Sequence, residues 1–147
     1  MRVFETAAKS VYESHVPRII IKNTKNKMKR TGPTNPILQS VIQELKKRSS
    51  EHSINLWKRV ANDLEKPTRQ RRVVNLSSIS RYTKENEIVV VPGKVLGAGN
   101  LEHKLTISAF QFSNGAKEKI ERVGAKIIPL LELSKENPSG KGVRIIG

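Results

Sequence analysis

Four cations between residues 66 and 72 are the side chains of this sequence best suited to bind another molecule. They are Lys66, Arg69, Arg71 and Arg72, and no acid lies among them. Arginine holds phosphate oxygens through paired hydrogen bonds, so these residue types predict contact with a phosphate polyanion. The run continues into an apolar stretch, which would anchor its far end in a core. A charge run of this kind can also be merely solvated, and the rest of the sequence decides between the two interpretations.

The overall charge favours contact with a polyanion. The 147 residues carry 28 Lys+Arg against 13 Asp+Glu, a formal net charge of +15. Residues 1–72 hold 17 basic and 6 acidic side chains, whereas residues 73–147 hold 11 and 7. So large an excess indicates a polyanionic partner and places the contact mainly in the first half. Hydrophobic residues make up 36%, which is enough for one folded domain of this length.

No constellation suited to catalysis or metal binding is present in the sequence. The three histidines, His15, His52 and His103, form no pair at helical metal-site spacing, and Asp63 is the only aspartate. The lack of cysteine excludes disulfides, thiolate zinc ligands and a cysteine nucleophile. No apolar run approaches the ~20 residues needed to span a bilayer, and the apolar segment of a secretory signal is missing. We therefore expect a non-enzymatic, cytoplasmic protein with no cofactor, metal, small-molecule substrate or membrane partner.

The glycines between residues 92 and 99 raise the question of a phosphate-binding loop, because backbone N–H groups of Gly-rich loops bind phosphate. A P-loop needs four residues between its glycines and a Gly-Lys-Ser/Thr ending, whereas Gly93-Lys94 is followed by Val95. The dinucleotide fingerprint needs three correctly spaced glycines and finds two. We therefore predict turns here, with Pro92-Gly93 as a turn dipeptide, while a backbone contact to RNA phosphate stays compatible with the pattern.

A first helix is predicted to begin at residue 36. Asn35 and Pro36 are typical of a helix N-cap and of the first helical position. Apolar residues then recur at helical spacing up to Leu45. Lys46-Lys47-Arg48 would occupy the last turn, where the helix dipole favours cations, so part of this basic run has a structural explanation.

A second helix is predicted to follow directly. Ser53 would cap it, and Trp57 lies within its apolar stripe, which predicts a buried side chain. Pro67 would stop this helix near Glu65.

Beyond the basic run, the pattern changes to short strands alternating with helices. Residues 73–82 are ambiguous between a strand and a short helix capped by Ser77. Strands are expected at 87–91, 94–96, 104–112, 126–128 and 143–146, and helices at 113–123, closed by Gly124, and at 130–135. The alternation predicts an α/β fold, with N-terminal helices followed by short, mainly parallel strands.

The aromatic residues leave little for base stacking. Trp57, Phe110 and Phe112 have the pattern of core residues, and Tyr82 is the one credible stacking residue in the main domain. The sequence therefore predicts a protein that binds structured nucleic acid through phosphate and shape.

Four long segments of the sequence are continuous enough to indicate a family. They are MKRTGPTNPIL, WKRVANDLEKPTRQRRVVNLSSISRYT, VVVPGKVLGAGNLEHKLTISAFQFSNGAKEKI and ENPSGKGVRIIG. Over residues 28–147 they resemble the archaeal and eukaryotic large-ribosomal-subunit protein L-eighteen-e family, which is related to bacterial large-subunit protein L-fifteen. Residues 1–27 depart from this pattern.

The resemblance implies a structural constituent of the large ribosomal subunit without catalytic activity, bound to large-subunit ribosomal RNA and neighbouring ribosomal proteins. It also implies an irregular superhelix of strand–strand–helix turns behind helical N-terminal elements. We expect residues 28–147 to be the domain and residues 1–27 a basic extension, either an arm ordered against a partner or an over-called start. A basic, chromatin-like DNA-binding protein is the alternative from another class.

The expected RNA contacts are basic residues spread over this domain. They are Lys29, Arg30, Lys58, Arg59, Lys66, Arg69, Arg71, Arg72, Arg81, Lys94, Lys104 and Lys141. Each is expected to neutralise phosphates brought together by RNA folding, with counterion release supplying much of the affinity.

Overall fold

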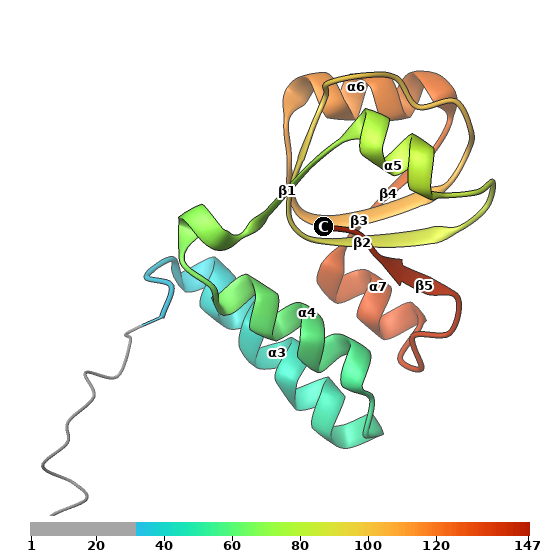
Figure 1. Cartoon of the computed structure of the whole chain (residues 1–147). Helices are drawn as coiled ribbons and strands as arrows, with labels where there is room; N and C mark the ends of the chain where they lie inside the picture. Colours follow the sequence, from blue (N-terminus) through green and yellow to red (C-terminus); the bar gives the residue numbers. More distant parts are fainter. Residues whose placement is uncertain (1–31) are drawn as a thin grey trace, which may run out of the picture. The chain divides into compact units, whose positions relative to one another are not determined.

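The structure, a computed structural model, describes residues 32–147, which form a parallel sheet with helices around it (Figure 1). In chain order the elements are α3 (Pro36–His52), α4 (Asn55–Glu65), the 3-10 turn η1 (Thr68–Gln70), β1 (Arg72–Asn75), α5 (Leu76–Tyr82), β2 (Ile88–Leu96), β3 (Thr106–Phe112), α6 (Asn114–Val123), β4 (Lys126–Pro129), α7 (Leu130–Glu136) and β5 (Val143–Ile145). The expected extension, residues 1–27, and the predicted contacts Lys29 and Arg30 lie outside the described residues. The predicted fold class, α/β with N-terminal helices, is confirmed.

Helix α3 begins as predicted but ends later. The Asn35 side chain accepts a hydrogen bond from a first-turn backbone N–H at 3.0 Å, and Pro36 occupies the first turn. Ser53 ends the helix in a left-handed conformation with φ 55°. Two predictions were therefore wrong: Ser53 does not cap α4, and residues 46–48 lie before the last turn. The physical reason is that no proline or glycine interrupts residues 37–52.

Helix α4 buries the apolar stripe that the sequence predicted. Trp57 is fully buried, and its Nε1 donates to the Pro138 carbonyl oxygen at 3.0 Å. The helix packs on α3 and on β2, and it ends ahead of Pro67 as expected. Ile54 precedes its first turn without a side-chain capping bond, so burial of the stripe is the main local reason that these residues form a helix.

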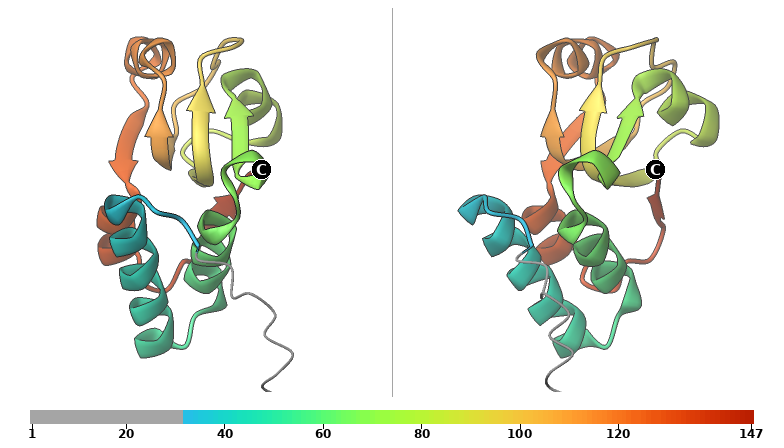
Figure 2. Two further views of the ribbon diagram at one scale, coloured as in Figure 1. Left: turned by 90° about the vertical axis from the view of Figure 1, so that its left-hand side faces the viewer. Right: turned by 60° about the vertical axis from the view of Figure 1, so that its left-hand side comes forward.

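Every strand pairing in the described sheet is parallel, as predicted. The order is β1-β2-β3-β4, and β5 also pairs with β2 (Figure 2, left, shows β1 to β4 side by side). β5 pairs with residues 88–90 of β2, whereas β1 pairs with residues 93–96. β1 and β5 therefore occupy successive lengths of the same edge of β2.

Strand β2 is one continuous strand of nine residues, where the sequence predicted two strands and a turn. Pro92 and Gly93 lie at a β-bulge inside it, because the register with β3 shifts between Val91 and Lys94. The proline is tolerated there because the hydrogen-bond ladder is interrupted at a bulge. A Cβ on Gly93 would overlap the carbonyl oxygen of Arg72 on β1, so this glycine permits the close approach of the two strands.

The ambiguous segment 73–82 contains both of the elements between which the sequence could not decide. β1 is followed at once by α5, and Asn75, rather than Ser77, precedes the helix. The Ser77 backbone N–H donates to the Ala98 carbonyl oxygen at 3.1 Å, which ties the start of α5 to the loop after β2. The prediction that Ser77 caps this helix was therefore wrong.

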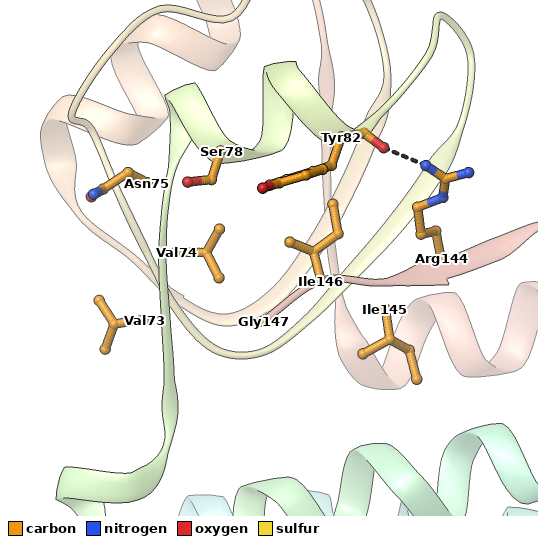
Figure 3. A pocket seen from close by; sticks show the side chains of 9 residues that line it. All are labelled: Val73, Val74, Asn75, Ser78, Tyr82, Arg144, Ile145, Ile146 and Gly147. Carbon is orange, nitrogen blue, oxygen red and sulfur yellow. Dashed lines mark hydrogen bonds between the residues drawn. The ribbon is translucent and has the colours of Figure 1, made fainter.

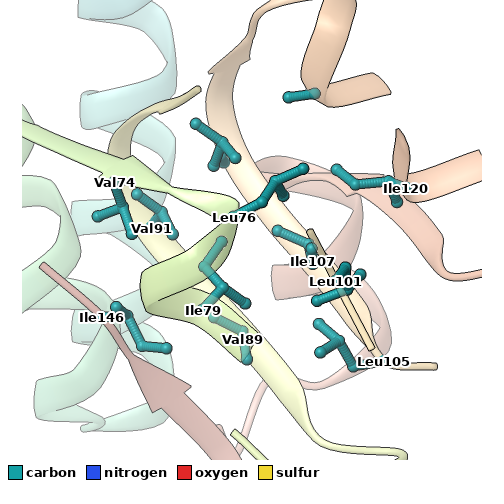
Figure 4. Close-up of a cluster of buried hydrophobic side chains, with 13 residues drawn as sticks. Val74, Leu76, Ile79, Val89, Val91, Leu101, Leu105, Ile107, Ile120 and Ile146 are labelled. Carbon is teal, nitrogen blue, oxygen red and sulfur yellow. The ribbon is translucent and has the colours of Figure 1, made fainter. Parts of the chain in front are cut away.

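Two hydrophobic clusters attach helical layers to the two faces of the sheet (Figure 1). Helices α5 and α6 cover a cluster that includes Ile107 and Ile120 (Figure 4). Helices α3, α4 and α7 cover the other face, where Trp57 and Val90 are buried. Successive residues of a strand point to opposite faces of the sheet. Because both faces are covered, the successive residues Ile107 and Ser108 of β3 are both fully buried.

Candidate nucleic-acid interface

The segment Lys66–Arg72 between α4 and β1, here called the basic connection, carries the largest group of predicted contact residues. Arg69 lies in η1, where the backbone N–H groups of the next two residues donate to the Pro67 carbonyl oxygen. Arg72 opens β1 and is paired with β2 in the sheet. The connection is thus held at both ends by ordered structure, and it places three arginines on a short stretch of backbone.

The three arginines of the basic connection form no ion pair with an acid among residues 32–147. Glu65, the acid nearest to them in sequence, is bound by Lys46 of α3. Arg71 Nε donates to the Lys66 carbonyl oxygen at 3.0 Å, which orients the guanidinium and leaves its terminal nitrogens for other partners. Local pairing therefore does not neutralise these charges.

Lys66 and Arg59 differ from the three arginines because both bind Asp63. Lys66 Nζ lies 2.5 Å from Asp63 Oδ1, and Arg59 Nε lies 3.4 Å from Oδ2. Only 5% of the Asp63 side chain is exposed. Desolvation by burial works to raise the pKa of Asp63, but the hydrogen bond and charge of Lys66, together with Arg59, outweigh it and hold that pKa below its ordinary value. Part of the charge on both cations is therefore neutralised within the fold.

Lys94 is brought next to the basic connection by strand pairing. Its register partners are Val73 on β1 and Gln111 on β3, and all three residues are exposed. Partners in register point to the same face of a sheet, so these side chains form an uncovered strip across three strands. The same face is covered further back along β2, where Val90 is buried under the helices. Lys94 also follows Gly93, the register partner of Arg72.

The other predicted contacts do not join this region as one group. Lys58 is exposed on α4, Arg81 is exposed at the end of α5, and Lys141 is exposed ahead of β5. Lys104 precedes the start of β3, and its side chain lies beside Gly124 at the end of α6. The structure therefore gathers the basic connection and Lys94, and it leaves the remaining predicted cations distributed over the surface.

The Gly-rich loop after β2 has a structural explanation. Lys119 Nζ of α6 donates to the carbonyl oxygens of Gly97 and Gly99 at 2.8 and 2.9 Å. The loop thus turns these two carbonyl oxygens toward the Lys119 ammonium group, which holds α6 to the end of β2.

His103 also has a structural role. Its Nε2 lies 2.8 Å from Thr83 Oγ1, and that hydroxyl donates to the Ile79 carbonyl oxygen at 2.6 Å. These bonds tie the loop before β3 to the end of α5. Within residues 32–147 there is no group of three or more His, Cys, Asp or Glu side chains that could hold a metal ion. The helices described in that range are all too short or too polar to cross a bilayer.

Two arginines that were not among the predicted RNA contacts link distant elements. Arg48 of α3, with 16% of its side chain exposed, donates to the Leu131 carbonyl oxygen at 2.6 Å and to the Ser134 hydroxyl. Arg144 of β5 donates to the Tyr82 carbonyl oxygen. The partners are 83 and 62 residues away in the chain, so sequence spacing carries no signal for either bond.

These features define a class of protein: a basic, parallel α/β domain with a cluster of internally unpaired arginines and no catalytic constellation in residues 32–147. Comparison with known proteins identifies the family. The family model described as ribosomal proteins 50S-L15, 50S-L18e and 60S L-twenty-seven-A matches residues 38–128. The chain belongs to this family of ribosomal proteins.

Individual relatives match over nearly their whole length. The chain is 45% identical over 119 residues to the large ribosomal subunit protein eL18 of Methanothermobacter thermautotrophicus, which covers 81% of this chain and 98% of that protein. It is 49% identical over 117 residues to eL18 of Sulfurisphaera tokodaii, with 80% and 96% covered. The match to eL18 of Methanococcus maripaludis is 47% over 119 residues, with 81% and 99% covered. The resemblance seen in the sequence is confirmed, and so is the prediction of a non-enzymatic protein, because this is a family of structural ribosomal components.

Proposed function

We propose that this protein is a structural constituent of the large ribosomal subunit and binds folded large-subunit ribosomal RNA through lysine and arginine contacts to phosphate. The observation that carries the proposal is the basic connection, whose three arginines have no acid partner among residues 32–147. Family membership favours ribosomal RNA over duplex DNA as the polyanion. Neighbouring ribosomal proteins and a cytoplasmic location on the ribosome are part of the same proposal.

The mechanism is electrostatic neutralisation at a fixed position. RNA folding brings phosphates together, and a guanidinium can bind two phosphate oxygens while counterions are released into solution. The basic connection is held between α4 and β1, so little backbone freedom is lost when RNA binds. Lys94, adjacent through strand pairing, would extend the same contact onto the sheet.

The proposal orders the predicted contacts by their internal partners. Arg69, Arg71, Arg72 and Lys94 come first, because no ion pair competes for them among the described residues and strand pairing brings Lys94 next to the arginines. Lys66 and Arg59 come next, because they share Asp63. The remaining cations stay predictions, as do the domain boundary at residue 28 and the contacts at Lys29 and Arg30, which lie outside residues 32–147.

The test is the salt dependence of binding to purified large-subunit ribosomal RNA. Replacing Arg69, Arg71 and Arg72 together by alanine removes three expected phosphate contacts. The slope of log K against log salt concentration should fall in magnitude by about one unit per contact, or slightly less. Arg69 is exposed, so its replacement should change the free energy of unfolding by no more than about 0.5 kcal/mol. Arg71 and Arg72 are half-buried, and loss of the Arg71 bond to the Lys66 carbonyl oxygen should cost a further ~0.5–1.5 kcal/mol.

A matched control removes the same charge elsewhere. Arg122, Lys126 and Lys135 are exposed cations of α6, β4 and α7, and their combined replacement by alanine should leave the slope nearly unchanged. An equal fall in both variants would show a general charge effect without a role for the basic connection. If the variant with alanine at positions 69, 71 and 72 folds and keeps the wild-type slope, the proposal is contradicted. Equally tight binding to duplex DNA would favour the DNA-binding alternative.

A further inference from the structure

A pocket beside Tyr82 is left unused by the proposed phosphate contacts. It has a volume of ≈ 630 Å³ and lies between β1, α5 and the end of β5 (Figure 3). At this place β1 and β5 pair with different parts of the same edge of β2, β1 with residues 93–96 and β5 with residues 88–90. The two strands therefore do not pair with each other, and space is left beside them. A volume of this order is typical of sites for small planar ligands, and it is sufficient for one nucleoside.

The lining of this pocket is apolar and unusually exposed. Tyr82 and Val73 are each 59% exposed and rank among the most exposed large hydrophobic side chains in residues 32–147. Figure 3 shows the Tyr82 side chain extending from α5 toward Ser78, with Val74 and Ile146 on one side of it. A ring supported by aliphatic side chains and open to solvent is a surface on which a nucleobase can stack.

Polar groups are also available in the pocket. The Asn75 amide and the Ser78 hydroxyl line it, and the hydrogen bond drawn among the lining residues joins Arg144 to Tyr82 instead. An amide and a hydroxyl can donate to and accept from the edge of a base. Arg144 is committed to the Tyr82 carbonyl oxygen and to Glu87 at 3.5 Å, so it positions the end of α5.

One unpaired cation lies beside the pocket, and a second precedes a lining residue in the chain. Arg81 precedes Tyr82 on α5 and is exposed. The Arg72 side chain lies beside the lining residue Gly147, where an added Cβ would approach Arg72 Cγ to 2.7 Å. Neither arginine pairs with an acid among residues 32–147. An apolar, aromatic pocket bordered by cations is complementary to a nucleotide, which has a stacking face and an anionic phosphate, more than to an aliphatic protein side chain.

We propose that this pocket holds the base of one unpaired nucleotide of the bound RNA, stacked on Tyr82, with its phosphate toward Arg72 or Arg81. The inference rests on the proposed RNA-binding function and deepens it. The sequence predicted binding through phosphate and shape, and it left Tyr82 as the one credible stacking residue. Here the protein would also recognise a single nucleotide that has left its helix.

The affinity test uses purified large-subunit ribosomal RNA and three variants. Tyr82→Ala should weaken binding about tenfold, since stacking of one base is lost. Its salt slope should match the wild type, because no phosphate contact is removed. Tyr82→Phe should bind within about twofold of the wild type, because it keeps the stacking ring. Ile37→Ala, which removes another exposed apolar side chain outside the pocket, should bind as the wild type does.

Crosslinking in the intact large subunit identifies the occupant. After ultraviolet irradiation, cleavage after glutamate releases the peptide from residue 66 to residue 85, which should carry a nucleotide at Tyr82. A photoreactive amino acid in place of Ser78, which lines the pocket, should likewise capture RNA. Capture of a neighbouring ribosomal protein there would overturn the inference. Wild-type affinity in folded Tyr82→Ala, with the arginine-dependent salt slope intact, would overturn it while leaving the proposed function standing. If replacing Arg69, Arg71 and Arg72 by alanine left the slope of log K against log salt concentration unchanged, that result would instead count against the proposed function.

Discussion

The cations of α3 and α4 and the cations that follow Pro67 look alike in the sequence but differ in the fold. Of the six lysines and arginines from residue 46 to residue 66, five form an ion pair, and only Lys58 does not. From Arg69 onward, Arg144 alone pairs with an acid among the described residues. A high density of positive charge therefore has two different outcomes in one chain.

This contrast shows that charge density alone does not locate a binding surface. In α3 and α4 the acids lie within reach of the cations. They stand either at helical spacing on the same helix, as in Lys47–Glu51, or on the neighbouring helix, as in Lys46–Glu65. Exposed pairs of this kind contribute little to stability, but they reduce the field that a polyanion would meet. The three arginines of the basic connection have no such acid partners, so their charge stays available to a polyanion. Three experiments test whether α3, α4 and their paired cations act within the fold, as this comparison requires.

The largest effect is expected at Trp57, which tests whether α4 serves stability rather than RNA contact. Trp57→Ala should lower the free energy of unfolding by about 3–5 kcal/mol, because a fully buried ring is removed and the Pro138 carbonyl oxygen loses its donor. Urea denaturation measures the loss, with Trp57→Phe as the milder control. A near-neutral effect on stability with a large loss of RNA binding would reverse the assignment.

A smaller effect is expected at Arg48, which tests whether paired cations of α3 act within the fold. Arg48→Met keeps much of the side-chain volume but removes the bonds to Leu131 and Ser134, and should cost about 1.5–3 kcal/mol. Lys47→Met is the control, because its exposed pair with Glu51 should be worth less than about 0.5 kcal/mol. Equal stability of the two variants would remove the distinction between them.

The smallest effect concerns Asp63, which tests how far Lys66 and Arg59 are neutralised by the fold. The pKa of Asp63 is lowered in the folded state, so its stabilisation is present above its unfolded pKa of about 3.9 and is lost as the pH falls through the folded value. Asp63→Asn should be less stable than the wild type at pH 6, and the gap should narrow toward pH 3. Urea midpoints across this range measure it; a constant gap would mean that the carboxylate charge contributes nothing.

Local patterns placed most elements correctly because their causes are local. Asn35 and Pro36 begin α3, and Pro67 ends α4, since capping and the missing proline N–H act within a few residues. The error inside β2 arose because longer-range structure overrode a local preference. Pro92-Gly93 has the composition of a turn, yet three parallel partner strands keep it inside β2 as a bulge.

Residue types and their spacing along the chain were enough to predict the α/β class and the family, because neither depends on knowing distant contacts. They also single out Arg69, Arg71 and Arg72 as phosphate contacts, which stays a prediction. Tertiary packing added the contacts between residues far apart in the chain, since Lys46 pairs with Glu65 across 19 residues and Arg48 donates to the Leu131 carbonyl oxygen across 83. It also determined that Tyr82 borders a pocket with Ile146. Such contacts follow from how whole elements pack, and no local pattern of residues encodes them.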